Sequence, residues 1–537
     1  MSVRIPYALL VTLVVALVAG AADAQQRLKT WKLREHYTWD SPHGRLLYFA
    51  DNAEWCVFAG EAEDSVVLDY VGFEVTLADG THFTQDDLGD GAAEPERFEG
   101  DFGAGRHIEV RFPEREGMVV IHRISILNEY PFMFFQLMLT NKRETPIEVA
   151  TIKPLVLKPG GIPQRAGEVE LELRSINTRG GRPVYSRNDA PIFGLVKIPA
   201  HPLTLSLGVL PRGRAQHGIF LDAYEGAWQG TITGEYKPAF ALAPGETLEA
   251  APLFVTANTP SEDEVSLYYA WALKSLQPVQ LQGHVPIVWA SVGEGGGLKE
   301  LVSNAKAARD VGIAHALVPA GWESLPGSHR GRLPDFPRDA GVIASVLSGA
   351  GMKAGVTVDA LAVQKLRDKY VVTADDGQSW VKLGDAEAHA AAVNHLRALL
   401  REGFDFLAVA PSAVPDAVLR ELGHTRAQAE HIAFQLAVEA ADGKPVFPTA
   451  ADILPAETGV WQEAARASNR MGRFALLVAP VQFDADKAGE LPAPLVDAMA
   501  GWEGPLEVVG RVNGKTKAGL RQVITRQKAA QETRIDG

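Results

Sequence analysis

The period of the hydrophobic pattern changes once along this 537-residue chain, directly after Asn258-Thr259-Pro260. Upstream of this point, short strand-like apolar runs are separated by clusters of Gly, Pro, Asn and Asp. Downstream, short apolar runs alternate with segments of helical period. Because each pattern needs its own arrangement of layers around a core, the change predicts two domains of different architecture. The length of the chain, which exceeds one ordinary core, agrees with this division.

Residues 25–258 are predicted to form a large antiparallel β-sandwich, or supersandwich. Many short strands separated by regular turn signals, such as Leu77-Ala78-Asp79-Gly80, are typical of this architecture. The sole cysteine, Cys56, lies in an apolar run and is predicted to be a buried, inert thiol. The clearest predicted strands are Asp64–Tyr70, Arg106–Phe112, Met118–Ile124 and Phe132–Leu139.

Residues 284–512 alternate short apolar strands with helices. This alternation predicts a parallel sheet, and seven or eight repeats predict a (β/α)8 TIM-type barrel. Seven strands are recognised, which leaves one strand of the barrel unassigned. They are Pro286–Ala290, Ala316–Val318, Lys353–Val358, Phe404–Ala410, Pro445–Phe447, Phe474–Val478 and Leu506–Val509. The expected fold class is therefore multidomain, an antiparallel β-supersandwich followed by an α/β barrel.

Two further segments flank the predicted barrel. Ser261-Glu262-Asp263-Glu264 has the pattern of a capping box and is predicted to open a linker helix within residues 259–283. Residues 513–537 are polar and basic, which indicates a frayed tail or a short helix.

The first 24 residues have the pattern of a cleaved signal peptide. Arg4 precedes the apolar run Ala8–Val18, and Ala22-Asp23-Ala24 is a small-x-small cleavage site. The run is shorter than the roughly 20 residues that a membrane-spanning helix needs. We therefore expect a secreted or periplasmic protein with no membrane span. The net charge of −14 also argues against a nucleic-acid partner.

Local motifs of the predicted barrel resemble those of a known enzyme family. The first strand ends in Trp289, and the segment after the second strand contains Gly321-Trp322. Gly351–Val356 resembles the third strand of the family, and Leu383–Ala388 resembles the lead-in to the fourth. These motifs, with the order of the domains, resemble the clan-D glycoside hydrolases of family 36, the α-galactosidases and the raffinose-synthase group. The resemblance covers most of the mature chain. It implies a supersandwich before a (β/α)8 barrel and a carbohydrate ligand.

The sequence departs from this family where the chemistry is expected. The second strand of the family ends in two Asp that hold sugar hydroxyls, and Pro319 and Ala320 stand there instead. The fourth strand ends in Lys-x-Asp, and Ala408 and Ala410 replace its lysine and its nucleophile. The resemblance assigns the acid/base of the sixth strand to Asp452. Retaining hydrolysis requires two carboxyl groups about 5 Å apart, so the vacant nucleophile position predicts that the ordinary reaction is lost.

Other acidic residues are candidates for a relocated site, each with a structural alternative. Asp359, just past the third strand, binds a sugar hydroxyl or caps the next helix. Asp452 is a retained acid or a cap for the following turn. Glu323 replaces the lost Asp pair or is a solvated loop residue. Asp484 and the nearby Asp486 line the barrel mouth or are simply exposed.

Three tryptophans are candidate platforms for sugar rings, because flat aromatic faces cover the C–H surface of a pyranose. Trp322, between Gly321 and Glu323 in a loop, is the strongest candidate, and core packing is the alternative for Trp289. Trp380 is the third. His315 lies in a strand and is predicted to be a core histidine. Because the histidines are scattered and there is one cysteine, neither a metal nor a cofactor is expected.

Three functions remain open from the sequence. The favoured hypothesis is a carbohydrate-binding or accessory protein on a degenerate α-galactosidase-like scaffold. The second is an active glycoside hydrolase or transglycosidase that uses relocated carboxylates from Asp359, Glu323, Asp452 or Asp484. The third is a structural or partner-binding module without a role in sugar chemistry.

Overall fold

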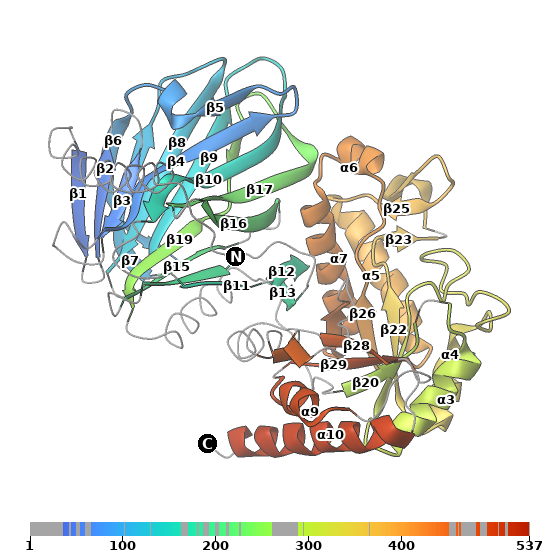
Figure 1. Ribbon diagram of the computed structural model, residues 1–537. Helices are drawn as coiled ribbons and strands as arrows, with labels where there is room; N and C mark the ends of the chain where they lie inside the picture. Colours follow the sequence, from blue (N-terminus) through green and yellow to red (C-terminus); the bar gives the residue numbers. More distant parts are fainter. Residues whose placement is uncertain are drawn as a thin grey trace, which may run out of the picture.

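The computed structural model describes most of residues 36–259 and 288–449 and parts of residues 458–535, with short gaps inside each range. Two large antiparallel sheets form the first part of the chain, and a parallel sheet with helices forms the second (Figure 1). The coarse architecture predicted from the change of period is therefore confirmed. The predicted signal peptide at residues 1–24 lies outside the described residues, and so does the predicted linker helix, apart from Thr259 at the end of a strand.

Within the described residues, the first sheet of the sandwich contains eight strands. Their order is β1 (His36–Ser41), β2 (Gly44–Phe49), β3 (Trp55–Phe58), β4 (Val66–Leu77), β10 (Ile147–Ile162), β17 (Ala227–Leu242) and β16 (Gln216–Tyr224), with β5 (His82–Thr84) beside β4. The short 3-10 helix η3 (Gln85–Asp87) follows β5.

The part of the second sheet that the structure describes contains nine strands. Their order is β11 (Glu170–Arg174), β14 (Phe193–Ile198), β15 (Leu203–Val209), β19 (Leu253–Thr259), β9 (Met133–Asn141), β8 (Met118–Leu127), β7 (Gly103–Arg111) and β6 (Ala92–Gly100), with β18 (Thr247–Glu249) beside β9. A separate hairpin joins β12 (Ile176–Arg179) to β13 (Arg182–Tyr185).

The core of the sandwich lies between the two sheets. Trp55 of the first sheet stacks on Phe135 of the second, with ring centroids 3.8 Å apart. Burial of such large side chains from both sheets stabilises the pair of layers. Cys56 is buried as predicted, and its Sγ donates a hydrogen bond to Asp69 Oδ1 at 3.2 Å. Burial and the neighbouring Asp69 carboxylate raise the pKa of the Cys56 thiol, so the thiol is the stable form.

The second part of the chain contains a curled sheet of seven parallel strands within the described residues. Their order is β27 (Val446–Pro448), β26 (Phe406–Val409), β22 (Lys353–Val358), β21 (His315–Val318), β20 (Val288–Ser291), β29 (Leu506–Gly510) and β28 (Ala479–Phe483). Closure into an eight-stranded barrel remains a prediction. The strand predicted at residues 474–478 lies outside the described residues, and β28 begins directly after it at Ala479.

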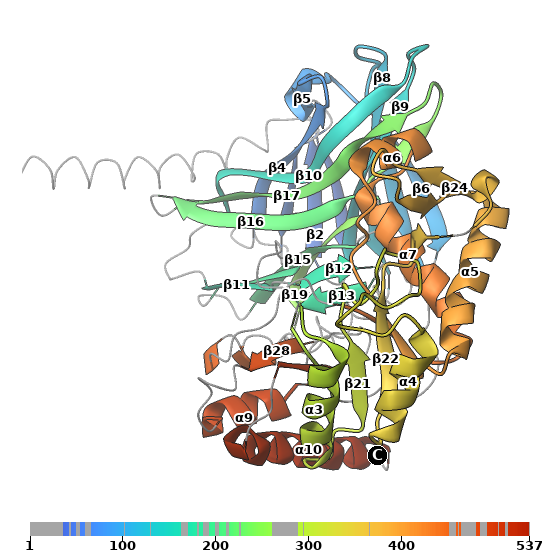
Figure 2. The ribbon, with the colours of Figure 1, turned by 90° about the vertical axis from the view of Figure 1, so that its right-hand side faces the viewer.

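Helices surround the parallel sheet (Figure 2). Side-chain caps mark several of their starts: Asp385 accepts from two amides of α5, and Thr425 forms a capping box with Gln428 at α7. The helices are α3 (Leu298–Arg309), α4 (Ala340–Gly349), α5 (Ala386–Arg401), α6 (Asp416–Leu422), α7 (Arg426–Ala441), α9 (Ala493–Ala500) and α10 (Gly514–Ile535). A small sheet of β23 (Ala362–Val363), β25 (Ser379–Val381) and β24 (Val371–Thr373), with the 3-10 helix η4 (Asp368–Tyr370), lies between β22 and α5 in the chain.

The C-terminal segment corrects the expectation of a frayed tail or short helix. It forms α10, a helix of 22 residues. Leu520, Val523 and Ile524 are buried, at the spacing that places them on one face of the helix. Gln527 Nε2 donates to the carbonyl of Trp502 at 3.3 Å. The segment is thus an integral part of the α/β half, although its composition is polar.

The two halves share a continuous hydrophobic core. Phe132, Phe134 and Phe254 of the sandwich belong to the same buried cluster as the strands and helices of the α/β half. The Thr425 hydroxyl at the start of α7 also donates to the carbonyl of Arg214 at 2.6 Å. Within the described residues, no helix is both long and apolar enough to cross a membrane.

Candidate functional site

The inward face of the parallel sheet carries an apolar layer. Trp289, Leu317, Phe406, Ala408 and Phe447 form one buried cluster drawn from four strands. Phe406 also occupies the space beside Gly355, because a Cβ added there would lie 2.1 Å from its ring. These side chains fill the middle of the sheet as in a packed barrel core.

Trp289 is part of this apolar layer, not a surface for sugar stacking. Its side chain is 1% exposed, and its ring lies 4.9 Å from that of Phe447 between centroids. Both faces of the indole are therefore in the protein interior. The alternative of core packing describes Trp289.

The end of β26 has no functional group beyond its backbone. Ala408 is fully buried, in register with Thr357 on β22 and Phe447 on β27. Ala410 follows the last residue of the strand, and its amide donates to the carbonyl of Val358 at 2.8 Å. The methyl groups of these two alanines stand where the family resemblance placed a lysine and an aspartate.

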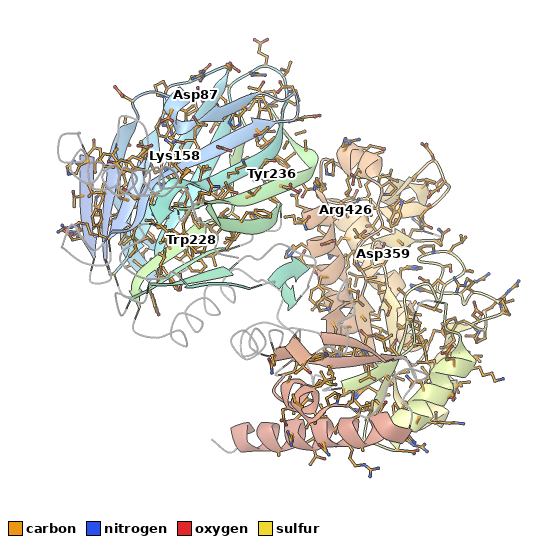
Figure 3. The ribbon with its side chains drawn as sticks, viewed as in Figure 1. Asp87, Lys158, Trp228, Tyr236, Asp359 and Arg426 are labelled. Atoms are coloured by element: carbon orange, nitrogen blue, oxygen red, sulfur yellow. The ribbon has the colours of Figure 1, made fainter. Side chains whose placement is uncertain are left out.

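Asp359 follows the last residue of β22 (Figure 3). Its Oδ1 accepts from the amide of Leu361 at 3.1 Å, and its Oδ2 accepts from the amide of Ala413 at 2.8 Å. Burial raises the pKa of Asp359, and the hydrogen bonds from these amides and from the Ser412 hydroxyl oppose that shift. Asp359 thus caps its own turn and holds the loop that follows β26, rather than capping the next helix.

Glu323 lies in the loop after β21 and is half-buried, so the alternative of a solvated loop residue is wrong. Its Oε1 accepts from the amide of His329 at 2.7 Å, and its Oε2 accepts from the amide of Gly327 at 3.1 Å. Burial raises the pKa of Glu323 to about 7, and the nearby carboxyl group of Asp359 adds to this shift. The structure therefore brings Glu323 and Asp359 together, from the ends of neighbouring strands.

Trp322 and Trp380 are also buried, at 1% and 3% exposure. The indole N–H of Trp322 donates to the carbonyl of Thr357 at 2.9 Å, which fixes the ring against β22. Trp380 lies in the central strand of the small sheet, paired with Ala362 and Val372. Neither ring presents an open face to a sugar, so the structure does not support the stacking role predicted for either residue.

His315 is half-buried at the start of β21, so it is not fully in the core as predicted. Its ring packs edge-on against Phe406, with centroids 5.9 Å apart. Burial, with a contribution from the nearby Lys353 ammonium, lowers the pKa of His315 to about 4. The imidazole is therefore neutral at neutral pH.

Three candidate acids cannot be placed relative to this region. Asp452, Asp484 and Asp486 lie outside the described residues. Among the residues that the structure does describe, no group of three His, Cys, Asp or Glu side chains could hold a metal ion.

Glu507 is an acidic residue that the sequence analysis did not single out. It lies on β29 in register with Trp289 on β20, and it is 8% exposed. Burial raises the pKa of Glu507 to about 7, although the Trp289 indole N–H and the Ser291 hydroxyl beside it favour the charged form. The available signal was the single acid within the apolar strand Leu506-Glu507-Val508-Val509.

Solved structures of α-galactosidases share this architecture over most of the chain. An α-galactosidase from Lactobacillus brevis matches with a TM-score of 0.53 and 11% identity, over 93% of this chain and 84% of that chain. A family 36 α-galactosidase from Geobacillus stearothermophilus matches with a TM-score of 0.54 and 10% identity, over 93% and 86%. The fold is that of the family 36 α-galactosidases.

Further structures of the Geobacillus stearothermophilus enzyme contain sugars. One variant was solved in complex with stachyose and matches with a TM-score of 0.55 and 10% identity, over 93% of this chain and 86% of that chain. Another variant was solved with raffinose. No family model matches the sequence, and no curated protein matches it. At these identities the similarity establishes the fold alone.

Proposed function

We propose that this chain is an exported carbohydrate-binding or accessory protein that uses an α-galactosidase-like scaffold without the hydrolysis typical of that scaffold. The observation that carries the proposal is the pair Ala408 and Ala410 at the end of β26. The architecture supports a saccharide ligand, because the structural neighbours were solved with raffinose and stachyose. Export follows from the predicted signal peptide.

The loss of hydrolysis follows from the chemistry of the reaction. A retaining glycosidase forms a covalent bond between the sugar and a carboxylate, while a second carboxyl group about 5 Å away protonates the leaving oxygen. The methyl group of Ala410 cannot form that bond. Pro319 and Ala320, which follow β21, also lack the carboxylates that hold sugar hydroxyls in the family.

The carboxylates present nearby are engaged in holding loops. Each of the two oxygens of Asp359 accepts a backbone amide, and so does each of the two oxygens of Glu323. An attack on a sugar by either group would require it to leave these bonds, and a hydrogen bond to a charged group contributes about 1.5–3 kcal/mol. This arrangement favours a structural role for both acids.

A binding assay combined with a turnover assay tests the proposal. Purified protein is screened on a glycan array, the strongest ligand is titrated by calorimetry, and the same preparation is incubated with raffinose, stachyose and a nitrophenyl α-galactoside. We expect saccharide binding without release of galactose. Absence of binding to every glycan would instead favour a structural or partner-binding module.

The alternative is a glycoside hydrolase that uses the pair Glu323 and Asp359. One observation favours it: the Asp359 carboxyl group contributes to raising the pKa of Glu323 to about 7, a value suited to a general acid. If the pair is catalytic, galactose release is abolished by Glu323→Gln and by Asp359→Asn, and the rate falls as pH rises through about 7. If any activity of the wild type survives both substitutions, this alternative is wrong.

A further inference from the structure

A cleft with a volume of about 510 Å³ lies on the outer flank of the α/β half. It is lined by His329, Arg330 and Arg338 from the loop before α4, by Asp339 and Ala340 at the start of α4, and by Glu402 after α5. Glu402 lies near the amino end of β26, whereas His329 and Arg330 belong to the loop that follows β21. The volume of the cleft is within the roughly 300–1,000 Å³ of small-molecule sites.

The loop that carries the two arginines is fixed by its own hydrogen bonds. The amide of Ser324 donates to the carbonyl of Arg330 at 2.8 Å, and the amide of Gly331 donates to the carbonyl of Arg338 at 3.3 Å. The side chain of Glu323 ties the same loop through two amides. The backbone positions of Arg330 and Arg338 are therefore set before any ligand arrives, which lowers the entropic cost of binding.

His329 anchors the wall of the cleft against α5. Its ring stacks on His395 with centroids 4.0 Å apart, and His395 Nε2 lies 2.9 Å from the carbonyl of Gly327. Burial lowers the pKa of His329 to about 3, and the neighbouring His395 contributes to this shift. His329 therefore contributes an uncharged imidazole to the lining at neutral pH.

The cleft is lined by two guanidinium groups and two carboxylates, so its charges balance. Few of these groups bond to other described residues. Arg330 and Arg338 form no ion pair with any residue that the structure describes. Asp339 uses Oδ1 to accept the amide of Gly341 at 2.9 Å, and the Glu402 side chain is exposed. An anion would meet the carboxylates of Asp339 and Glu402, and a cation would meet the two guanidinium groups.

An uncharged ligand with many hydroxyl groups satisfies both sets of side chains. Its hydroxyl oxygens accept from the guanidinium N–H groups, and its hydroxyl hydrogens are donated to the carboxylates. We propose that this flank cleft binds a neutral oligosaccharide at a site separate from the mouth of the sheet. The proposal deepens the carbohydrate-binding function proposed above and rests on it.

The experiment is a calorimetric titration of the full chain with stachyose. The flank variants are the double substitution Arg330→Ala with Arg338→Ala, and the near-isosteric Glu402→Gln, which preserves folding if the double variant does not fold. Arg401→Ala is the matched control, because Arg401 is the exposed neighbour of Glu402 and does not line the cleft. Ala410→Phe places a large side chain at the carboxyl end of β26 and tests for a saccharide site there.

We expect the flank variants to lose one class of stachyose sites or to bind it at least tenfold more weakly, while Arg401→Ala binds as the wild type does. If the flank variants bind as the wild type does and Ala410→Phe abolishes binding, the flank inference is wrong and the proposed function stands. If the wild type binds no stachyose, the flank inference fails, and the glycan array decides the proposed function separately. Tighter binding of an acidic oligosaccharide, such as a heparin fragment, would overturn the argument from charge balance.

Discussion

Glu507 and Trp289 stand side by side on adjacent parallel strands, an acid and an indole in register in the interior of the sheet. The Trp289 indole N–H and the Ser291 hydroxyl lie beside the Glu507 carboxyl group, and neither of these donors carries a charge. Burying a carboxylate without a neighbouring cation costs free energy, so the folded protein favours the protonated form of Glu507.

This protonation predicts how stability depends on pH. The folded-state pKa of Glu507 is raised to about 7 from an ordinary value of 4.5, so the folded protein retains a proton that the unfolded chain releases. The contribution of this group to stability is full below about pH 4.5 and is lost as pH rises through about 7. We expect Glu507→Gln to remove this loss and to raise the free energy of unfolding at pH 8 by roughly 1–3 kcal/mol relative to wild type. Urea unfolding at pH 5 and pH 8 measures it, with exposed Glu421→Gln as the control. A variant with the same pH dependence as the wild type would show that Glu507 does not titrate in this range.

Asp359 is predicted to hold the loop after β26. Asp359→Asn keeps one oxygen and replaces the other with an NH2 group, so one of the amides of Leu361 and Ala413 loses its acceptor. We expect a loss of about 1–3 kcal/mol of stability and faster hydrogen exchange at Ala413. Hydrogen exchange with mass spectrometry checks this, and exposed Asp375→Asn is the matched control. Unchanged exchange would mean that another contact holds the loop.

Under the proposed function, a carboxylate introduced at position 410 alone should not create a glycosidase. Ala410→Asp supplies a nucleophile, but Pro319, Ala320 and Ala408 still lack the sugar-binding side chains of the family. Because positioning contributes a large share of catalysis, we expect no hydrolysis of an α-galactoside above the uncatalysed background. A sensitive fluorogenic α-galactoside is the appropriate substrate. Measurable turnover that Asp359→Asn then removes would indicate that the mouth retains more of the machinery than we propose.

The buried face of α10 should be as important for stability as a core helix. Leu520→Ala removes a fully buried side chain and leaves a cavity, so we expect a loss of about 2–5 kcal/mol. Exposed Gln522→Ala, on the same helix, should change the stability little. Thermal unfolding of both variants compares them directly. Equal melting temperatures of the two variants would show that the segment contributes no more to stability than an exposed tail.

The order of the two architectures could be predicted because it depends on hydrophobic period, which the backbone imposes directly. Six of the seven described parallel strands lie within the ranges expected for them or overlap these ranges. The seventh predicted strand, Phe474–Val478, lies outside the described residues, and β28 begins directly after it at Ala479. The apolar run continues through Ala479-Pro480-Val481 without a turn signal that marks a strand limit. Strand limits in such runs depend on pairing with β29, which is a tertiary property.

The candidate site was harder to predict for reasons that Trp322 and Glu323 illustrate. A tryptophan between a glycine and an acid in a loop looks exposed in sequence, but Trp322 is held under the loop by a hydrogen bond to the carbonyl of Thr357. The Glu323 carboxylate accepts hydrogen bonds from backbone amides further along its own loop. Residue types do not indicate which backbone amides donate, so Glu323 could not be distinguished from a solvated residue by sequence. Glu507 could not be singled out by sequence, because one acid in an apolar strand is equally typical of an exposed strand at the edge of a sheet.

The buried cluster around Phe132 and Phe254, which the two halves share, couples their unfolding. Aromatic rings of the sandwich pack among the helices and strands of the other half. Neither half can therefore unfold without exposing apolar surface of the other half to water. We therefore expect calorimetry to record one cooperative transition, and either half expressed alone to be prone to aggregation through the surface thus uncovered.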